Sequence, residues 1–309
     1  MPSLRHDLLA LLVPRLRGAG AARDEDSERA AVEACHADLD RSLPTRAVPG
    51  LTRRFDHEVD HSAGFPVHVL TRRGASPSRT LLWLHGGGFV SPIDALHVRY
   101  VARLAAALDV RVVLPDYPLT PEHTWRDSHQ ALVDLATGWA GRGGLLLGGD
   151  SAGGGLALAV AQTLRDRGEV RPEHLLLISP WVDLTTSSPA TSWFDRRDPW
   201  LQLSRMRLYA RWWAGSADDQ ARPEVSPALG DLRDLPPTLM FCGSRDLLVP
   251  ACRRLARRAA DAGWDLTYVE EPGAIHVYPL LPGVPEAARA WDTTLELVQA
   301  ALPDPESPR

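Results

Sequence analysis

The chain has 309 residues, 44% of them hydrophobic and 24% charged, so it is long enough to bury one large core with a small cap. A formal net charge of -5 indicates neither a nucleic-acid partner nor attraction to an anionic membrane surface. The sequence contains no lysine, so all 34 of its strongly basic residues are arginines. The odd number of cysteines, without metal-ligand spacing, disfavours a disulfide framework and a zinc site. We expect buried, unreactive cysteines.

The first 50 residues predict amphipathic helices. Leu8, Leu11 and Leu12 share one helical face, and a second helix is expected from about Ser27 to Ser42. The short apolar run near the start lacks the charged n-region and the small-residue cleavage site of a signal peptide. No segment reaches the roughly 20 apolar residues that a membrane span needs. We therefore expect a cytoplasmic protein without a membrane partner, whose residues 1–50 form a tail or part of a lid.

From Phe55 onward, strands and helices alternate along the chain. The continuous apolar run at Thr80–Leu84 is typical of a strand buried on both faces, whereas the first two strands alternate and predict an antiparallel pair. Such alternation favours an α/β fold with a mostly parallel, doubly wound central sheet and helices on both faces. The expected strands are Phe55–Val59, Pro66–Thr71, Thr80–Leu84, Val110–Leu114, Leu145–Leu147, His174–Ile178, Thr238–Cys242 and Leu266–Val269. The expected helices are Leu96–Leu108, Asp127–Trp139, Ser151–Arg167, Ala251–Ala262 and Glu286–Ala300.

An aromatic-rich insertion at residues 185–228 interrupts this alternation and divides the expected core into residues 51–184 and 229–309. Because it lies between two core strands, we expect it above the edge of the sheet where such folds bind ligands. Its aromatic side chains either pack the insertion onto the core or line an apolar pocket, and we expect one or two of them to do the latter. They are Trp193, Phe194, Trp200, Tyr209, Trp212 and Trp213.

The segment Gly149–Gly153 reads Gly-Asp-Ser-Ala-Gly and lies between a predicted strand and a predicted helix. This context is the one required by a nucleophile elbow, a sharp turn that lifts the Ser151 hydroxyl above the sheet at a helix N-terminus. Glycines are expected at both ends of the turn because side chains there would collide. The motif alone is weak evidence for a catalytic serine, so the interpretation depends on whether the sequence also provides a base and an acid.

A serine nucleophile needs a histidine base, which in turn needs an orienting carboxylate. In chain order these follow the serine as acid and then histidine. Asp246 follows a predicted strand end, where its alternative role is a helix N-cap, and His276 follows the next strand. His276 is the base candidate because it alone follows Asp246. The competing histidines are His85, His97, His123, His129 and His174.

Three consecutive glycines in His85-Gly86-Gly87-Gly88-Phe89 follow the buried strand Thr80–Leu84. They let the main chain approach a bound ester and direct N–H groups toward it. Those groups, with the N–H of Ala152, can hold the oxyanion of a tetrahedral intermediate. We expect His85 to hold this loop rather than to act as a base, and the alternative of a flexible glycine turn fits its position poorly.

These motifs resemble the hormone-sensitive-lipase-like branch of the α/β-hydrolases, the bacterial carboxylesterases with an HGGG motif, from about residue 78 to 300. The resemblance implies a triad of Ser151, Asp246 and His276, with Gly87, Gly88 and Ala152 as oxyanion donors and no cofactor or metal. It also implies a helical cap built from residues 1–50 and 185–228, and pairing of two copies as a homodimer. The matching segments are His85–Phe89, Asp116–His123, Gly149–Gly154, Ser179–Leu184, Ser226–Ala228 and Gly243–Asp246.

Two segments depart from the family pattern. Residues 1–77 match only loosely, and Val90-Ser91-Pro92-Ile93 replaces another glycine-containing turn, so Pro92 is expected to reshape the pocket entrance. Asp116–His123 is expected to support the oxyanion loop.

We expect a serine carboxylic-ester hydrolase that forms an acyl-enzyme on short- to medium-chain or other small-molecule esters. A specialised deacetylase, lactonase or cyclising enzyme would use the same site, since fold and triad do not name the substrate. A non-catalytic ligand-binding member would usually lack the base or the nucleophile, both of which are present here. An interfacial lipase has little support beyond the apolar face near Leu8.

Overall fold

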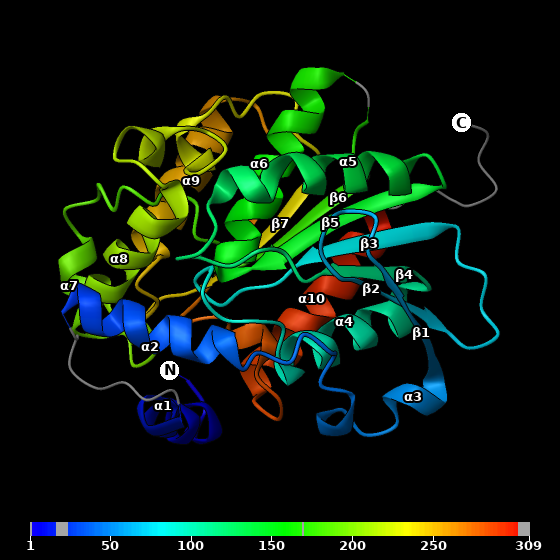
Figure 1. The fold of residues 1–309 in the computed structure, drawn as a ribbon, viewed down its shortest axis with the longest axis horizontal. Coiled ribbons are helices and arrows are strands. Elements are labelled where there is room, and N and C mark those ends of the chain that lie inside the picture. Colours follow the sequence, from blue (N-terminus) through cyan, green and yellow to red (C-terminus); the bar gives the residue numbers. More distant parts are fainter. Residues whose placement is uncertain (1, 17–23, 169, 302–309) are drawn as a thin grey trace.

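The structure is a computed structural model that describes residues 2–16, 24–168 and 170–301. An eight-stranded sheet with the order β1-β2-β4-β3-β5-β6-β7-β8 runs through its centre (Figure 1). The strands are β1 (Phe55–Asp60), β2 (Val67–Arg72), β3 (Arg79–Leu84), β4 (Arg111–Pro115), β5 (Gly144–Asp150), β6 (His174–Ile178), β7 (Thr238–Gly243) and β8 (Leu266–Glu271). The α-helices are α1 (Leu4–Leu16), α2 (Glu25–Ala37), α3 (Leu51–Arg54), α4 (Ala95–Leu108), α5 (His129–Ala140), α6 (Ser151–Arg167), α7 (Thr191–Asp195), α8 (Leu203–Ala214), α9 (Val249–Asp261) and α10 (Pro285–Ala301).

The sheet is parallel from β4 to β8, whereas β2 pairs antiparallel with both β1 and β4. This confirms the predicted α/β fold, and each strand and helix expected between Phe55 and Ala300 is present. Among these elements, the largest shift of a boundary is in β5, which runs on to Asp150 rather than ending at Leu147. Parallel strands place their carboxyl ends at one edge of the sheet, so the loops after β5, β7 and β8 meet there.

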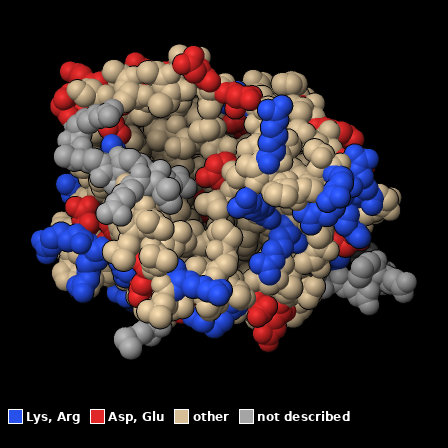
Figure 2. Space-filling model, turned by 90° about the horizontal axis from the view of Figure 1, so that it is seen from below, with Lys and Arg blue, Asp and Glu red and all other residues tan. Residues whose placement is uncertain are grey.

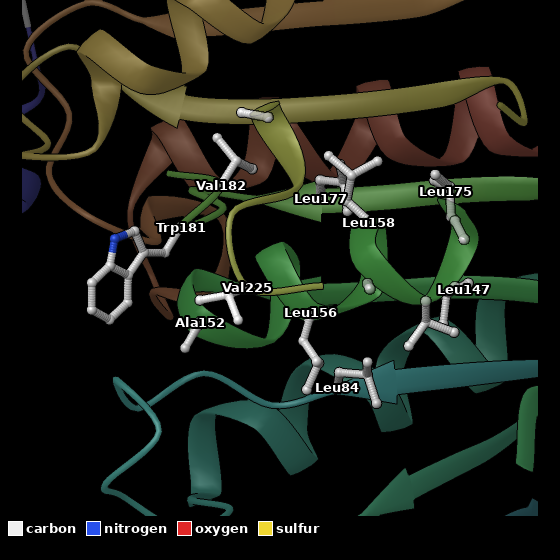
Figure 3. Close-up of a cluster of buried hydrophobic side chains, with 14 of the residues drawn as sticks. Leu84, Leu147, Ala152, Leu156, Leu158, Leu175, Leu177, Trp181, Val182 and Val225 are labelled. Atoms are coloured by element: carbon white, nitrogen blue, oxygen red, sulfur yellow. The ribbon is translucent and has the colours of Figure 1, made fainter. Parts of the chain in front are cut away.

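Helices cover both faces of the sheet, as expected for a doubly wound fold. Helices α5, α6 and α9 pack on one face, and α4 and α10 pack on the other (Figure 1). Figure 3 shows Leu156 and Leu158 of α6 among Leu84, Leu147 and Leu177 of β3, β5 and β6. All five side chains are at most 2% exposed, and burying each contributes roughly 1.5–3 kcal/mol. This packing fixes α6, and with it the residue at which α6 begins.

Parts of the two segments expected to form a cap, α2 from the first and α7 and α8 from the second, lie together beyond one edge of the sheet. Figure 1 shows α2 beside α7 and α8, to the left of the strands. Glu28 of α2 accepts a hydrogen bond from the Tyr209 hydroxyl of α8 (2.6 Å) and pairs with Arg205 (3.1 Å). Glu25 likewise accepts a bond from the Trp212 indole (3.1 Å). Charged and aromatic contacts therefore connect the N-terminal segment to the insertion.

Helix α2 ends at Ala37, five residues before the predicted end at Ser42. The reason is local, because the Asp40 carboxylate accepts the Ser42 N–H at 2.9 Å. Such a turn offers the backbone an alternative to helical hydrogen bonds. The expected burial of all cysteines is wrong for Cys35, which is exposed on α2, whereas Cys242 and Cys252 are buried.

Helix α1 turns four of its leucines, Leu4, Leu8, Leu11 and Leu12, away from the protein, whereas Leu9 packs partly against the core. Leu8 and Leu11 are 61% and 72% exposed, and the buried side of the helix carries His6, Ala10 and Val13 instead. Ser3 anchors the start of the helix, because its backbone N–H and its hydroxyl both donate to the Glu286 carboxylate of α10, at 2.5 and 2.9 Å. The amphipathic pattern thus predicted the helix but not the face that packs.

The protein surface carries interspersed charges on the face seen from below. Figure 2 shows blue and red side chains separated by wide uncharged areas there. Every blue residue is an arginine, since the chain has no lysine. No helix within the described ranges is long and apolar enough to cross a bilayer.

Candidate active site

Ser151 lies at the junction of β5 and α6, in the turn predicted as a nucleophile elbow. Its φ of 51° is in the left-handed region, which a serine adopts only where the surrounding structure imposes it. A Cβ at Gly149 would come within 2.5 Å of the Gly153 carbonyl oxygen, and one at Gly153 would collide with the Leu84 carbonyl oxygen. The two glycines are therefore required by the close approach of the turn to β3.

Three side chains form a continuous hydrogen-bonded chain at this edge of the sheet. His276 Nε2 lies 2.9 Å from Ser151 Oγ, and His276 Nδ1 lies 2.9 Å from Asp246 Oδ2. Asp246 follows β7 by three residues and His276 follows β8 by five, so parallel strands bring both to Ser151. All three side chains are buried, with exposures of 6% for Ser151, 0% for Asp246 and 2% for His276.

The charges around these three side chains favour a histidine that can accept a proton. Burial by itself would lower the pKa of His276, but the nearby carboxylates, Asp246 first among them, together outweigh burial and raise that pKa above its ordinary value. Asp198 and Asp150 add to the rise. Asp246 is itself held by the Leu248 N–H, which donates to its Oδ1 at 2.9 Å and leaves Oδ2 for the histidine.

The loop that carries His276 has supports that the sequence did not reveal. The Val277 N–H donates to the Ser179 hydroxyl (3.0 Å), just beyond β6. On the other side, the Ile275 N–H donates to Nε2 of His6, a fully buried residue of α1 (3.1 Å). Only the position of Ser179 directly after a strand could have indicated such a role.

The glycine loop Gly86–Gly88 lies against the elbow and is held by Asp150. The Gly86 N–H and the Trp83 indole N–H both donate to Asp150 Oδ1 at 3.2 Å. Gly87 has a φ of 115°, and a Cβ there would come within 2.7 Å of the Ser91 carbonyl oxygen. Gly87 and Gly88 line the same pocket as Ser151, and Ala152 is the residue after it. The structure thus brings the three expected oxyanion donors to the serine.

The stretch from Asp116 to His123 packs behind this loop. The Tyr117 hydroxyl donates to the His85 carbonyl (2.7 Å), and the two rings stack with centroids 4.3 Å apart. The Thr120 N–H donates to the Phe89 carbonyl at 2.8 Å. Burial, followed by the neighbouring His97, lowers the pKa of His85 to about 3, so His85 is a neutral part of this support.

A second buried histidine pairs with the residue before the nucleophile. His97 Nε2 lies 3.3 Å from Asp150 Oδ2, and His97 Nδ1 accepts the backbone N–H of Asp94 (2.9 Å), whose Oδ1 lies 3.1 Å away. Burial would lower the pKa of His97, but Asp150 and Asp94 together outweigh burial and raise that pKa to about 10. His129 donates to or accepts from Thr163 (2.9 Å), and burial lowers the pKa of His129 and of His174 to about 4. In the part of the chain that the structure describes, none of these three histidines hydrogen-bonds to the Ser151 hydroxyl, whereas His276 does.

A pocket of about 180 Å³ opens at the serine. Of the six aromatic residues in the insertion, Trp200 and Tyr209 line it, whereas Trp212 and Trp213 are buried elsewhere. Pro92 lines it as well, at the position where the family pattern is broken. Within the described ranges, no group of three or more histidine, cysteine or acidic side chains is arranged to hold a metal ion.

Comparisons with known proteins identify the family of this chain. A family model described as alpha/beta hydrolase fold matches residues 81–280. An acetyl-hydrolase of Streptomyces hygroscopicus is 35% identical over 74% of this chain and 78% of its own. An esterase of Acinetobacter venetianus is 30% identical over 61% of this chain and 63% of its own. A solved esterase from the bacterial hormone-sensitive lipase family is 28% identical, with a TM-score of 0.78 over 98% of this chain and 100% of that one. The chain therefore belongs to the α/β-hydrolase fold family, in its hormone-sensitive-lipase-like branch.

Proposed function

We propose that this protein is an ester hydrolase in which Ser151 is the nucleophile, His276 the general base and Asp246 the orienting acid. The observation that carries the proposal is the unbroken chain of two 2.9 Å contacts from Ser151 through His276 to Asp246. The protein is an ester-hydrolysing α/β-hydrolase, in keeping with relatives named acetyl-hydrolase and esterase.

In the first half of the reaction, His276 Nε2 takes the Ser151 proton while Ser151 Oγ attacks the ester carbonyl. The carbonyl π electrons move to the oxygen, and the N–H groups of Gly87, Gly88 and Ala152 hold the resulting oxyanion. Removing one such donor typically costs on the order of 10²–10³ in rate. The imidazolium then protonates the alcohol, which leaves an acyl-enzyme on Ser151.

In the second half, His276 takes a proton from water, and the hydroxide oxygen attacks the acyl carbon. The tetrahedral intermediate collapses, the Ser151 oxygen leaves with the proton from His276, and the carboxylic acid departs. Asp246 holds the imidazole in the tautomer that keeps Nε2 free to accept, and it stabilises the imidazolium.

The pocket favours esters of short acyl chains. Its volume of about 180 Å³ is below the roughly 300–1,000 Å³ of pockets that take drug-sized ligands. Apolar side chains, among them Met206 and Leu280, line it beside Ser151. The name acetyl-hydrolase of the relative from Streptomyces hygroscopicus points in the same direction, and it supports a dedicated deacetylase as the second candidate.

We also propose that residues 1–50 and 185–228 together form the cap over this pocket. The contacts of Glu25 and Glu28 with α8 support that grouping. The cytoplasmic location and the homodimer stay predictions.

Initial rates on p-nitrophenyl esters from acetate to long acyl chains test the proposal, with Ser151→Ala as the control. We expect rates that peak at short chains and fall by at least about 10⁴-fold in the variant, while its circular dichroism and melting temperature stay close to wild type. Turnover by Ser151→Ala near the wild-type rate would overturn the assignment. Stoichiometric labelling of Ser151 by an organophosphate without turnover of simple esters would favour the dedicated deacetylase.

A further inference from the structure

A second carboxylate lies beside the Ser151–His276–Asp246 chain. Asp198 belongs to the insertion, between α7 and α8, and is only 9% exposed. Its Oδ1 accepts the N–H groups of Trp200 (2.7 Å) and Leu201 (3.1 Å), within the insertion. Its Oδ2 accepts the N–H of Leu247 (2.7 Å), in the loop after β7. One carboxylate therefore joins the insertion to the core.

The contact with Leu247 acts on the backbone that presents the catalytic acid. The Leu247 N–H belongs to the peptide bond directly after Asp246, and the next N–H, that of Leu248, donates to Asp246 Oδ1. Two consecutive peptides are thus held by two carboxylates. This arrangement fixes the direction of the Asp246 side chain, whose Oδ2 is the atom that contacts His276.

The contacts within the insertion act on the other side of the histidine. By holding the Trp200 N–H, Asp198 sets the start of the segment that places the Trp200 ring edge-on to the His276 ring, with centroids 5.9 Å apart and planes at 76°. Trp200 and Leu201 also line the pocket. Asp198 therefore connects the acid, the base and the pocket wall.

Asp198 also contributes charge. The titratable groups that act on it are Asp246 and His276, and Asp150 acts on His276 as well. The Cys242 thiol lies 3.6 Å from Asp246, and burial raises the pKa of Cys242 well above its usual range, so it stays neutral. Burial, followed by the Asp246 charge, raises the pKa of Asp198 to about 6, which leaves Asp198 ionised above that pH.

We infer that Asp198 is a positioning residue for the catalytic chain, which ties the insertion to the loop after Asp246 and places a second negative charge near His276. The inference rests on the proposed function. It means that the insertion does more than shape the pocket, because assembly of the acid–base pair depends on the insertion being folded against the core.

The test is Asp198→Asn, with Asp195→Asn as the matched control. Asp195 lies in the same insertion and its carboxylate accepts a backbone N–H, that of Leu203 (2.7 Å), but this bond stays within the insertion. An amide at position 198 keeps one accepting oxygen, loses the charge and cannot accept on its nitrogen side. Rates on p-nitrophenyl acetate are measured per active site, titrated with an organophosphate, across pH 5–9.

For Asp198→Asn we expect kcat and kcat/KM to fall together by about 10- to 100-fold, with KM changed less than about threefold. The acidic limb of the kcat/KM profile should move to lower pH, because removing a negative charge lowers the pKa of His276. Asp195→Asn should stay within about twofold of wild type with an unmoved limb. A merely structural role would lower the number of titrated sites without moving the limb.

Asp198→Glu separates charge from position. It keeps the charge but displaces the carboxylate, so it should lower kcat and leave the acidic limb in place. If Asp198→Asn has a wild-type kcat and an acidic limb at the wild-type pH, the inference is overturned. If that variant yields no folded protein, wild-type kcat per titrated site in Asp198→Glu overturns it instead. A wild-type protein inactive on every ester contradicts the proposed function itself, which is a different result.

Discussion

Two buried histidine–aspartate pairs flank Ser151, and only one of them reaches its hydroxyl. The two ring nitrogens of His276 have different partners, since Nδ1 contacts Asp246 and Nε2 contacts Ser151. His97 Nε2 lies beside an Asp150 oxygen, whereas its Nδ1 accepts the backbone N–H of Asp94, so both ring nitrogens are held away from Ser151. Carboxylates raise the pKa of both histidines against the effect of burial. A raised pKa therefore does not identify a base, whereas a ring nitrogen directed at the nucleophile does.

Because of this difference in geometry, we expect the two histidine–aspartate pairs to have different roles. The His276 pair is arranged to exchange a proton with Ser151. The His97 pair neutralises Asp150, whose other oxygen holds the Gly86 N–H and the Trp83 indole. We therefore expect loss of the first pair to remove activity and loss of the second to remove stability.

The largest effect is expected for His276→Gln. Without a base, kcat/KM on p-nitrophenyl acetate should fall by at least about 10⁴-fold, as for removal of a triad histidine in other serine hydrolases. The melting temperature should change by only a few degrees. Retention of more than a hundredth of wild-type activity would contradict the role of His276, and the same assay on His97→Gln shows whether the two histidines differ.

A smaller effect, on a different quantity, is expected for His97→Gln. Breaking a buried ion pair from one side leaves the Asp150 charge uncompensated, which costs about 3–5 kcal/mol in the free energy of unfolding. Urea denaturation at neutral pH measures it. Activity per titrated site should stay within about tenfold of wild type, and a variant of normal stability that has lost its activity would reverse the comparison.

The pH dependence of stability provides the control for that variant. Because the pKa of His97 is raised to about 10 from an ordinary 6.5, its contribution is fully present below pH 6.5 and is lost as the pH rises toward 10. Wild type should lose this stability between neutral and alkaline pH, and His97→Gln should lack that part of the loss.

The smallest effect is expected for Asp94→Asn. Asp94 is the N-cap of α4 and the second carboxylate on His97, and its side chain accepts the Leu96 and His97 N–H groups. Asparagine caps helices about as well as aspartate, so we expect a loss below about 1 kcal/mol in urea denaturation. A loss as large as that of His97→Gln would mean that Asp94, and not Asp150, is the main partner of His97.

The fold and the catalytic candidates could be predicted because their signals are local. Strand runs such as Thr80–Leu84, the glycines that flank Ser151 and the order of Asp246 and His276 can all be recognised in short windows of sequence. The structure brings together the residues that those windows indicated. Their catalytic roles await the measurements above.

The supporting residues could not be predicted because their partners are distant in the chain. Asp198 bonds to Leu247 across 49 positions, and His6 to Ile275 across 269. Neither contact leaves a repeat or a spacing in the sequence. His97 is one of the competing histidines and lies on a predicted helix, but its pairing with Asp150 joins residues 53 positions apart. The packing face of α1 could not be predicted for a related reason, since periodicity predicts that a helix has an apolar face but not what that face packs against.

The docking of α1 has a practical consequence for protein engineering. Pro2, just ahead of α1, packs so closely on Gly273 that a Cβ at Gly273 would come within 2.6 Å of the proline ring, and His6 of α1 accepts the Ile275 N–H. The loop that presents His276 is therefore held in part by residues at the other end of the sequence. A library of variants aimed at this loop should include positions 2 and 6, although His6 precedes Ile275 by 269 positions.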